Sequence, residues 1–258
     1  MITDKFIREL EEIVGKAHVS VSRANTELYS YDASLARGKP GVVVFPGDSR
    51  ETARIVRAAH RAGIPFVPRG FGTNLSGGTI VTVEGLVVCL SRLNRILGIY
   101  PEGRYAVAQP GVTNLELQDA LANIGFFYAP DPASQKVSTL GGNAGENSGG
   151  PRCLKYGVTT NHILGMEMIM PDGEVVRTGG AALDPPGYDL RGVVVGGEGT
   201  LGVVTEITVR ILPLSESIIT MLATYDSIAD AARSVSDIIS AGILPTTLEM
   251  MDAMIIKA

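Results

Sequence analysis

A glycine-rich stretch at residues 68–78 is the first segment whose composition suits ligand binding. It is made of Pro-Arg-Gly-Phe-Gly-Thr-Asn-Leu-Ser-Gly-Gly and directly follows an apolar run typical of a strand. Glycine tolerates positive φ and lets the backbone approach a ligand closely, so successive N–H groups can converge on phosphate oxygens. Arg69 can add a charge-assisted hydrogen bond, and Thr73, Asn74 and Ser76 offer neutral donors. The stretch predicts an anion-binding loop, and a plain glycine-rich surface loop is an equally good interpretation of this segment alone.

Two familiar phosphate-binding motifs do not fit this stretch. A P-loop requires Gly-Lys followed by Ser or Thr, and these residues are absent. A Rossmann fingerprint requires glycine or alanine where Leu75 stands, and an acidic residue about 20 positions further on, where Leu90 stands. We therefore exclude both kinds of nucleotide-binding site here.

A second glycine-rich window covers residues 139–150, with the sequence Thr-Leu-Gly-Gly-Asn-Ala-Gly-Glu-Asn-Ser-Gly-Gly. Its glycine content argues against a helix interior, and its polarity argues against a core strand. Its amide, hydroxyl and carboxyl groups suit the recognition of a heteroaromatic ring with several donors and acceptors. A flexible loop is the alternative interpretation.

The third window, residues 196–202, contains a literal Gly-x-Gly-x-x-Gly from Gly197 to Gly202. The dinucleotide fingerprint must open a helix, but residues 203–209 are Val-Val-Thr-Glu-Ile-Thr-Val, which predicts a strand. Glycines that lead into a strand indicate instead that the backbone passes close to a bound ligand.

Composition narrows the class of protein. The chain has 258 residues, 45% of them hydrophobic and 19% charged, with a formal net charge of -5. These values exclude a disordered chain, and the acidic balance argues against nucleic acid as a partner. There is no apolar run of about 18 residues that would predict a transmembrane segment, and the acidic N-terminus is not a signal peptide. Cys89 and Cys153 form no metal-binding or disulfide pattern, so we expect a reducing, cytoplasmic location.

The elements that must position the windows follow from hydrophobic periodicity. Residues 4–16 predict an amphipathic helix that ends near Gly15. Residues 41–46 and 64–67 predict strands on either side of a helix, with Asp48 in a capping box at its start and Gly63 at its end. This strand–helix–strand order predicts a βαβ unit with a parallel pair.

Further elements are predicted along the same domain. They are a strand at 86–90, a hairpin of 96–100 with 105–108, a helix opened by the capping box of Thr113 and Glu116, two strands at 163–170 and 174–177 around a turn, and a strand at 203–212. Residues 213–216 predict a boundary. Beyond it we expect a strand at 218–224, a helix from Ser227 and a strand at 246–250, which together are too small to bury their own faces. We expect the chain to be the front part of a longer protein, or a partner to supply the rest.

The three windows, in this order, resemble the FAD-binding domain of the vanillyl-alcohol oxidase/p-cresol methylhydroxylase (PCMH) family. The likeness is carried by residues 68–78, 110–112, 139–150 with 155–157, and 196–204, and is greatest to the group that comprises the glycolate oxidase flavoprotein and the D-lactate dehydrogenases. The resemblance implies an α+β fold. Residues 1–37 would be an N-terminal helical segment, 38–215 a PCMH-type domain whose two α/β subdomains grip FAD, and 216–258 the start of a ferredoxin-like cap domain for substrate.

The resemblance also implies the residues that contact FAD. The pyrophosphate loop would comprise Arg69, Gly70, Phe71, Gly72, Thr73, Asn74, Leu75 and Ser76. The flavin and its phosphate side would be lined by Pro110, Gly111, Thr139, Gly141, Gly142, Asn143, Glu146, Asn147, Ser148 and Tyr156. The adenine–ribitol side would be lined by Glu198, Gly199, Gly202, Val203 and Val204. Some relatives attach FAD covalently through a histidine in the pyrophosphate loop, and this loop has none, so we expect non-covalent FAD.

The chain departs from the family in its histidines. The family carries substrate-binding and proton-handling histidines in the cap domain, and here the only histidines are His18, His60 and His162. We expect His18 and His60 to be solvated on surface helices and His162 to be structural. The catalytic base is therefore unknown, no metal site is expected, and we expect the isolated chain to bind FAD with little or no turnover.

The activity implied by the resemblance is oxidation of a small 2-hydroxy acid, of the glycolate or D-lactate type, to a 2-oxo acid by hydride transfer to flavin N5. One alternative is a non-catalytic flavin-binding or electron-transfer assembly subunit without its own substrate site. Another is a nucleotide-sugar reductase, against which the Glu146-Asn147-Ser148 sequence argues. The resemblance also implies a second flavoprotein and an iron–sulfur subunit as partners, in the cytoplasm or peripheral to the inner membrane through those partners.

Overall fold

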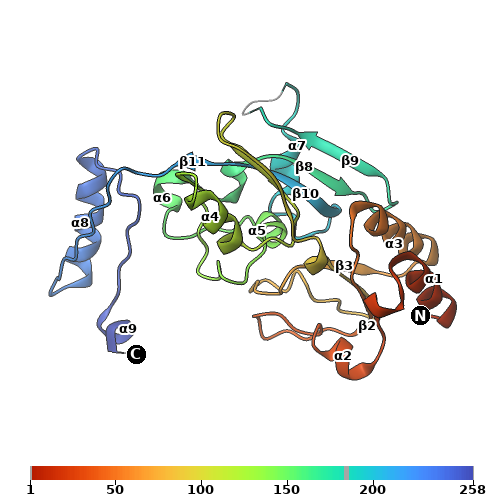
Figure 1. The fold of residues 1–258 in the computed structure, drawn as a ribbon. Coiled ribbons are helices and arrows are strands. Elements are labelled where there is room, and N and C mark those ends of the chain that lie inside the picture. The colour runs from red at the N-terminus through yellow and green to blue at the C-terminus, as the bar shows by residue number, and fades with distance from the viewer. Residues whose placement is uncertain (1, 183–185, 258) are drawn as a thin grey trace.

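Two β-sheets, each with its own packed helices, form most of the chain, and a C-terminal segment extends away from them (Figure 1). The computed structural model describes residues 2–182 and 186–257. The first sheet has the strand order β1-β2-β4-β3, with β1 Val19–Ser20, β2 Pro40–Val44, β4 Gly85–Cys89 and β3 Phe66–Arg69. The second has the order β5-β6-β10-β8-β9, with β5 Ile96–Tyr100, β6 Tyr105–Ala108, β10 Val203–Arg210, β8 Ile163–Ile169 and β9 Val175–Gly179. A short pair joins β7 Phe126–Phe127 to β11 Leu212–Pro213.

The first sheet contains the predicted βαβ unit. Helix α3, Ser49–Ala62, begins at Asp48, whose side chain accepts a hydrogen bond from the Glu51 N–H at 2.8 Å, and ends at Gly63 in the left-handed conformation. Strands β2 and β3 are parallel, as predicted, but they do not pair with each other. Strand β4 lies between them and pairs with both. The carboxyl ends of three parallel strands therefore meet at one edge.

The second sheet is antiparallel, and the predicted hairpins are confirmed. Helix α4, Asn114–Ala122, begins with the predicted capping box of Thr113 and Glu116. The remaining helices are α1 Asp4–Val14, α2 Arg23–Glu27, α5 Leu140–Glu146, α6 Cys153–Tyr156, α7 Leu190–Val194, α8 Ile228–Ser240 and α9 Ala253–Lys257, with 3-10 turns η1 Lys16–His18, η2 Leu90–Arg92 and η3 Thr159–His162. This mixed architecture confirms the predicted α+β class.

The cores show how the two sheets are joined. One core lies among α1, α3 and the first sheet, but it also contains Ile169 of β8 and Val203 of β10. The other lies between α4, α5 and the second sheet. Because α3 packs on residues of both sheets, it fixes one relative to the other.

The expectation that residues 139–150 avoid helix is wrong for the first half of that window, which forms α5. Thr139 accepts the N–H of Gly142 at 3.2 Å, and Asn147 ends the helix with φ +48°. Leu140 and Ala144 are buried in the second core. Glycine costs about 1 kcal/mol per residue in a helix, and here capping and burial offset that cost.

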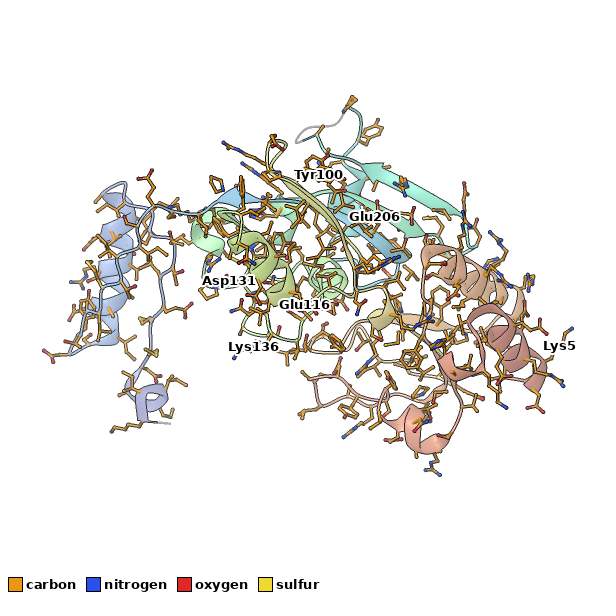
Figure 2. The ribbon with its side chains drawn as sticks, viewed as in Figure 1. Lys5, Tyr100, Glu116, Asp131, Lys136 and Glu206 are labelled. Atoms are coloured by element: carbon orange, nitrogen blue, oxygen red, sulfur yellow. The ribbon has the colours of Figure 1, made fainter. Side chains whose placement is uncertain are left out.

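The C-terminal segment differs from its prediction as well. Helix α8 begins after Ser227 as expected, with the Ser227 side chain as its cap. Residues 218–224 and 246–250, all of them described, are irregular and not strands. A strand needs a hydrogen-bonding neighbour, and no described strand lies beside either segment. The segment meets the body near Asp131, labelled in Figure 2, where Lys155 Nζ lies 3.5 Å from Thr246 Oγ1.

Within the described ranges, no helix has both the length and the apolar character that a membrane crossing requires.

Candidate functional site

A partly open cavity lies between the two sheets and is lined by residues of both. It begins beyond the carboxyl ends of β3 and β4, where open parallel sheets bind ligands. All three glycine-rich windows contribute to its wall. The residues that line it are Pro68, Arg69, Gly70, Gly78, Thr79, Leu90, Pro110, Thr139, Gly141, Gly142, Ala144, Gly145, Glu146, Val194, Glu198, Gly199, Leu201, Gly202 and Val204.

Arg69 is the cationic group in this wall. It is the last residue of β3 and is only 5% exposed. Its Nη1 donates to Thr79 Oγ1 at 3.2 Å, and its guanidinium lies 5.5 Å from the centre of the Tyr29 ring. Burial lowers the pKa of Arg69, although neighbouring groups that include Asp32 oppose this. The guanidinium remains charged, so the cavity holds a fixed cation at the end of β3.

The loop after Arg69 turns along the edge of the cavity. Gly72 has a φ of +70°, a conformation that favours glycine, and a Cβ there would also displace the Arg69 guanidinium. Of the predicted pyrophosphate loop, Arg69 and Gly70 line the cavity. The other members, Phe71, Gly72, Thr73, Asn74, Leu75 and Ser76, are not among the lining residues. Phe71 and Leu75 are exposed.

Helix α5 presents one face to the cavity. Gly141, Gly142, Gly145 and Glu146 are on that face. Asn143 is on the opposite, buried face, where its carbonyl accepts the Ser148 N–H at 2.9 Å. The Asn147 side chain accepts the Thr160 N–H at 2.9 Å. Asn143, Asn147 and Ser148 therefore hold the shape of this window and are not lining residues.

Pro110 lines the cavity from the turn after β6, while the neighbouring Gly111 donates its N–H to Leu93 O at 2.7 Å and is not a lining residue. The third window joins the end of α5, because Glu198 N–H donates to Gly145 O at 2.9 Å. Glu198, Gly199, Gly202 and Val204 line the cavity, whereas Val203 is fully buried in the first core. Two separate predicted windows are thus held together by backbone hydrogen bonds.

Family models match both parts of the chain. The model of an FAD binding domain matches residues 40–179, more than half of the chain. The chain belongs to the FAD-binding domain family. A second model, FAD linked oxidases, C-terminal domain, matches residues 214–258.

Relatives agree with this assignment. The chain is 46% identical to "Glycolate oxidase subunit GlcD" of Bacillus subtilis (strain 168) over 98% of its length, and 32% identical to "D-lactate dehydrogenase" of Anaerostipes hadrus over 97%. It covers 54% and 53% of those proteins, so it spans about half the length of the curated relatives it matches. The structure of p-cresol methylhydroxylase with substrate bound has the same fold, with a TM-score of 0.76 at 20% identity, over 91% of this chain and 48% of that one.

FAD is the cofactor of this family, and the cavity of the FAD-binding domain suits it. At Gly145 an added Cβ would meet nothing closer than Glu198 Cα at 3.9 Å, so this face of α5 leaves room for a flat group. The cation at Arg69 matches a pyrophosphate, and the glycine-lined wall matches a ring system.

Tyr156 is a further predicted contact that does not line the cavity. It is not among the lining residues, and its ring packs edge-on against Phe127, with 5.6 Å between the ring centres. Of the histidines, His60 is exposed on α3, His18 is half-buried in η1, and His162 is buried with Nε2 2.9 Å from Tyr156 O. Among the described residues, no group of three His, Cys, Asp or Glu side chains is arranged to hold a metal ion.

Sequence reasoning missed several residues of the cavity wall. Thr79, Leu90, Val194 and Leu201 line the cavity but were not among the predicted contacts. Leu90 directly follows β4, so it lies at the sheet edge where the carboxyl ends of the parallel strands meet. Knowledge of the strand order would have predicted it as a lining residue. No sequence signal indicates Asp32 or Tyr29, which support Arg69 from the N-terminal segment.

Proposed function

We propose that the chain is the FAD-holding part of an oxidoreductase that converts a small 2-hydroxy acid, of the glycolate or D-lactate type, to the 2-oxo acid. The observation that carries the proposal is that three windows far apart in the chain line one cavity with a buried arginine in its wall. The names of the relatives, glycolate oxidase subunit and D-lactate dehydrogenase, support the substrate class. When bound, the flavin ring supplies the acceptor for the hydride from the α-carbon, while a base takes the hydroxyl proton.

We assign roles to the lining residues by their chemistry. Arg69 and the backbone of Gly70 hold the pyrophosphate, because a guanidinium forms strong hydrogen bonds with phosphate oxygens. The wall formed by Pro110, Thr139 and the glycines of α5 lies along the flavin. The wall at Glu198–Val204 lies along the adenine–ribitol side. The predicted contacts that do not line the cavity stay predictions: Phe71, Gly72, Thr73, Asn74, Leu75, Ser76, Gly111, Asn143, Asn147, Ser148, Tyr156 and Val203.

Attachment of FAD is proposed to be non-covalent, since residues 68–78 contain no histidine. The test is an absorption spectrum of the purified protein before and after acid precipitation. We expect flavin bands in the native protein and free FAD in the acid supernatant. A protein that stays colourless after incubation with FAD would contradict the proposed function, and flavin retained in the pellet would contradict non-covalent attachment.

The substrate class is tested by anaerobic addition of glycolate or D-lactate to the yellow protein after it is combined with the domain or partner that completes its substrate side, because we expect little or no turnover from this chain alone. Bleaching of the flavin bands by either acid, with glyoxylate or pyruvate as product, supports the proposal. Unchanged bands with both acids, in a protein whose FAD dithionite can reduce, would contradict it. Glycerate and 2-hydroxyglutarate extend the series and define how large a side group is accepted.

A role as an assembly subunit is the second candidate, favoured by the word "subunit" in the name of the 46% identical relative. We propose that residues 216–258 belong to a separate substrate-side domain and that further subunits, a second flavoprotein and an iron–sulfur protein, contact the chain in the cytoplasm or at the inner membrane. Ile218, Ile219, Met221 and Leu222 are each more than four-fifths exposed, which supports a covering partner. Co-purification from the native host tests this, and recovery of the chain alone would contradict it.

A further inference from the structure

Asp32 is a buried carboxylate that touches the pyrophosphate loop from another part of the chain. It is 7% exposed. Its Oδ1 accepts the Ser34 N–H and its Oδ2 accepts Asn74 Nδ2, both at 2.7 Å. Next to it, the Ala33 N–H donates to Asn74 O at 3.1 Å. The middle of the loop is therefore bound through both the side chain and the backbone of Asn74.

The hydrogen bonds continue from Asn74 to the cavity. Thr79 Oγ1 donates to Asn74 Oδ1 at 3.1 Å, and Arg69 Nη1 donates to Thr79 Oγ1 at 3.2 Å. Arg69 and Thr79 both line the cavity, at the two ends of the loop, while Asn74 does not. Three hydrogen bonds in series thus join Asp32 to the guanidinium.

The direction of this series is fixed at Asp32. An ionised carboxylate only accepts hydrogen bonds, so it turns the NH₂ group of Asn74 towards itself and the amide oxygen towards Thr79. The hydroxyl group of Thr79 then donates its single proton to the amide oxygen of Asn74. The lone pairs of the Thr79 oxygen remain free to accept a hydrogen bond from Arg69. Because an unpartnered buried charge is costly, Asp32 holds Asn74 in place, and with it the loop between Gly70 and Thr79.

We propose that Asp32 is a positioning residue for the cofactor. It fixes the pyrophosphate loop and the orientation of the Arg69 guanidinium without contacting FAD. This rests on the proposed function, in which Arg69 and Gly70 hold the pyrophosphate. A segment that precedes the first β-α-β unit therefore takes part in FAD binding, although the glycine-rich windows all lie after it.

The test is the dissociation constant of FAD, measured by quenching of flavin fluorescence on the full chain. Asp32→Asn keeps the size of the side chain but sets an NH₂ group against the NH₂ of Asn74. We expect FAD to bind about tenfold more weakly, which is about 1.4 kcal/mol, and ADP, used as a competitor, to lose affinity by the same factor. Asp48→Asn is the matched control: it replaces another hydrogen-bonded carboxylate on the same sheet layer, and asparagine caps a helix as well as aspartate does.

A swapped pair separates positioning from damage to the fold. In Asp32→Asn combined with Asn74→Asp, the new amide donates to the new carboxylate, which still accepts from Thr79, so each hydrogen bond keeps a donor and an acceptor. We expect the FAD affinity to return to within about threefold of the wild type. FAD or ADP affinity within about twofold of the wild type in the single variant, or no recovery in the swapped pair, would overturn the inference.

The failure of this inference is distinguishable from the failure of the proposed function. If Arg69→Met weakens FAD binding and Asp32→Asn does not, only the role of Asp32 is wrong. If the wild type itself does not bind FAD, or Arg69→Met binds it as well as the wild type, the proposed placement of the pyrophosphate is wrong.

Discussion

Glu146 and Glu198 lie in different glycine-rich windows and converge on the same glycine. A Cβ added to Gly78 would lie 3.1 Å from Oε1 of Glu146 and 2.9 Å from Oε2 of Glu198. Burial raises the pKa of Glu146 and the charge of Glu198 adds to the rise, while the hydrogen bond from Ser76 Oγ, at 2.7 Å, opposes it. Two carboxylates therefore share one corner of a cavity that we assign to an anionic cofactor.

The first prediction concerns the pH dependence that Glu146 gives to the protein without flavin. A raised pKa in the folded state means that the stability contributed by this group is present below its ordinary pKa of 4.5 and is lost as pH rises through the folded value. Glu146→Gln keeps an acceptor for Ser76 but cannot ionise. We expect the thermal midpoint of the variant to rise relative to that of the wild type as pH increases from about 4 to about 7. Glu174→Gln, at an exposed glutamate, is the control, and a gap that does not change with pH would contradict the prediction.

The second prediction is that one substitution at Gly145 increases the stability of the protein and weakens FAD binding. At Gly145 an added Cβ meets only Glu198 Cα, at 3.9 Å, and otherwise points into the cavity. Gly145→Ala should stabilise α5, by up to about 1 kcal/mol since alanine is the better helix former, and should weaken FAD binding because the methyl group occupies cavity space. Urea unfolding without FAD and flavin fluorescence titration measure the two effects. Gly180→Ala, where a Cβ also finds open space but away from the cavity, should leave FAD affinity unchanged. Equal FAD affinity of Gly145→Ala and the wild type would show that the flavin does not lie on this face.

The fold was predictable where local signals and tertiary packing agree. Helix α3 begins at Asp48 and ends at Gly63 as its sequence indicates, because capping is decided by neighbouring residues. Helix α5 was not predictable, since its glycines oppose helix and it depends on burial of Leu140 and Ala144 as well as on the Thr139 cap. The irregular state of residues 218–224 was not predictable either. A segment with the composition of a strand forms one only when a neighbouring strand is present to pair with it.

The candidate site was predictable in outline and not in detail. The resemblance of the three windows to the FAD-binding family implied Arg69, Gly70, Gly141 and Glu198 as contacts, and all four line the cavity. Which face of α5 points outward depends on its packing, so Asn143 could not be separated from Gly142 in advance. The support of Arg69 by Asp32 crosses 37 positions and depends on how the N-terminal segment folds back, which no local pattern reveals.

The third prediction concerns Glu167 of β8, which joins the second sheet to helix α3. Its carboxylate accepts Ser49 Oγ of α3 at 2.6 Å, Thr205 Oγ1 of β10 at 2.9 Å and Arg177 Nη2 of β9 at 2.6 Å. Burial raises the pKa of Glu167, but these hydrogen bonds outweigh burial and the net direction is downward. Its stabilising contribution is therefore present above the ordinary pKa of 4.5 and is lost as pH falls through the folded value.

Glu167→Gln should lower the free energy of unfolding at pH 7 by about 1–3 kcal/mol, because an amide cannot accept from all these donors. The deficit should shrink as pH falls below the ordinary pKa of 4.5 and through the lowered pKa of folded Glu167, because the wild type then becomes protonated as well. Urea denaturation at pH 7 and across the acidic range measures this. Glu206, labelled in Figure 2, lies 3.5 Å from the same Arg177 on the exposed side, and Glu206→Gln should cost less than about 0.5 kcal/mol. Equal losses in the two variants would contradict the role given to Glu167.

The fourth prediction concerns His162, which is 2% exposed and has its Nε2 2.9 Å from Tyr156 O. Since a carbonyl can only accept, Nε2 carries the proton, and Nδ1 has no partner among the described residues. Burial lowers the pKa of His162; the bond to Tyr156 O opposes this and the charge of Arg210 adds to it. In the unfolded chain His162 takes up a proton near its ordinary pKa of 6.5, whereas in the folded protein it stays neutral to lower pH. The free energy of unfolding therefore decreases as pH falls below 6.5.

His162→Gln removes this proton uptake and keeps an N–H for Tyr156 O. We expect the variant to have a lower thermal midpoint than the wild type at about pH 7.5, because it loses the edge-on packing of the imidazole against Tyr128. The difference in thermal midpoint should narrow towards about pH 5.5, because protonation of His162 in the unfolded chain destabilises only the wild type. His60→Gln, on the exposed side of α3, should follow the wild type at every pH. Bound FAD should keep its absorption bands in both variants, because neither side chain lines the cavity. A gap between His162→Gln and the wild type that stays constant with pH would contradict the prediction, because it would mean that His162 has the same pKa in the folded and the unfolded protein.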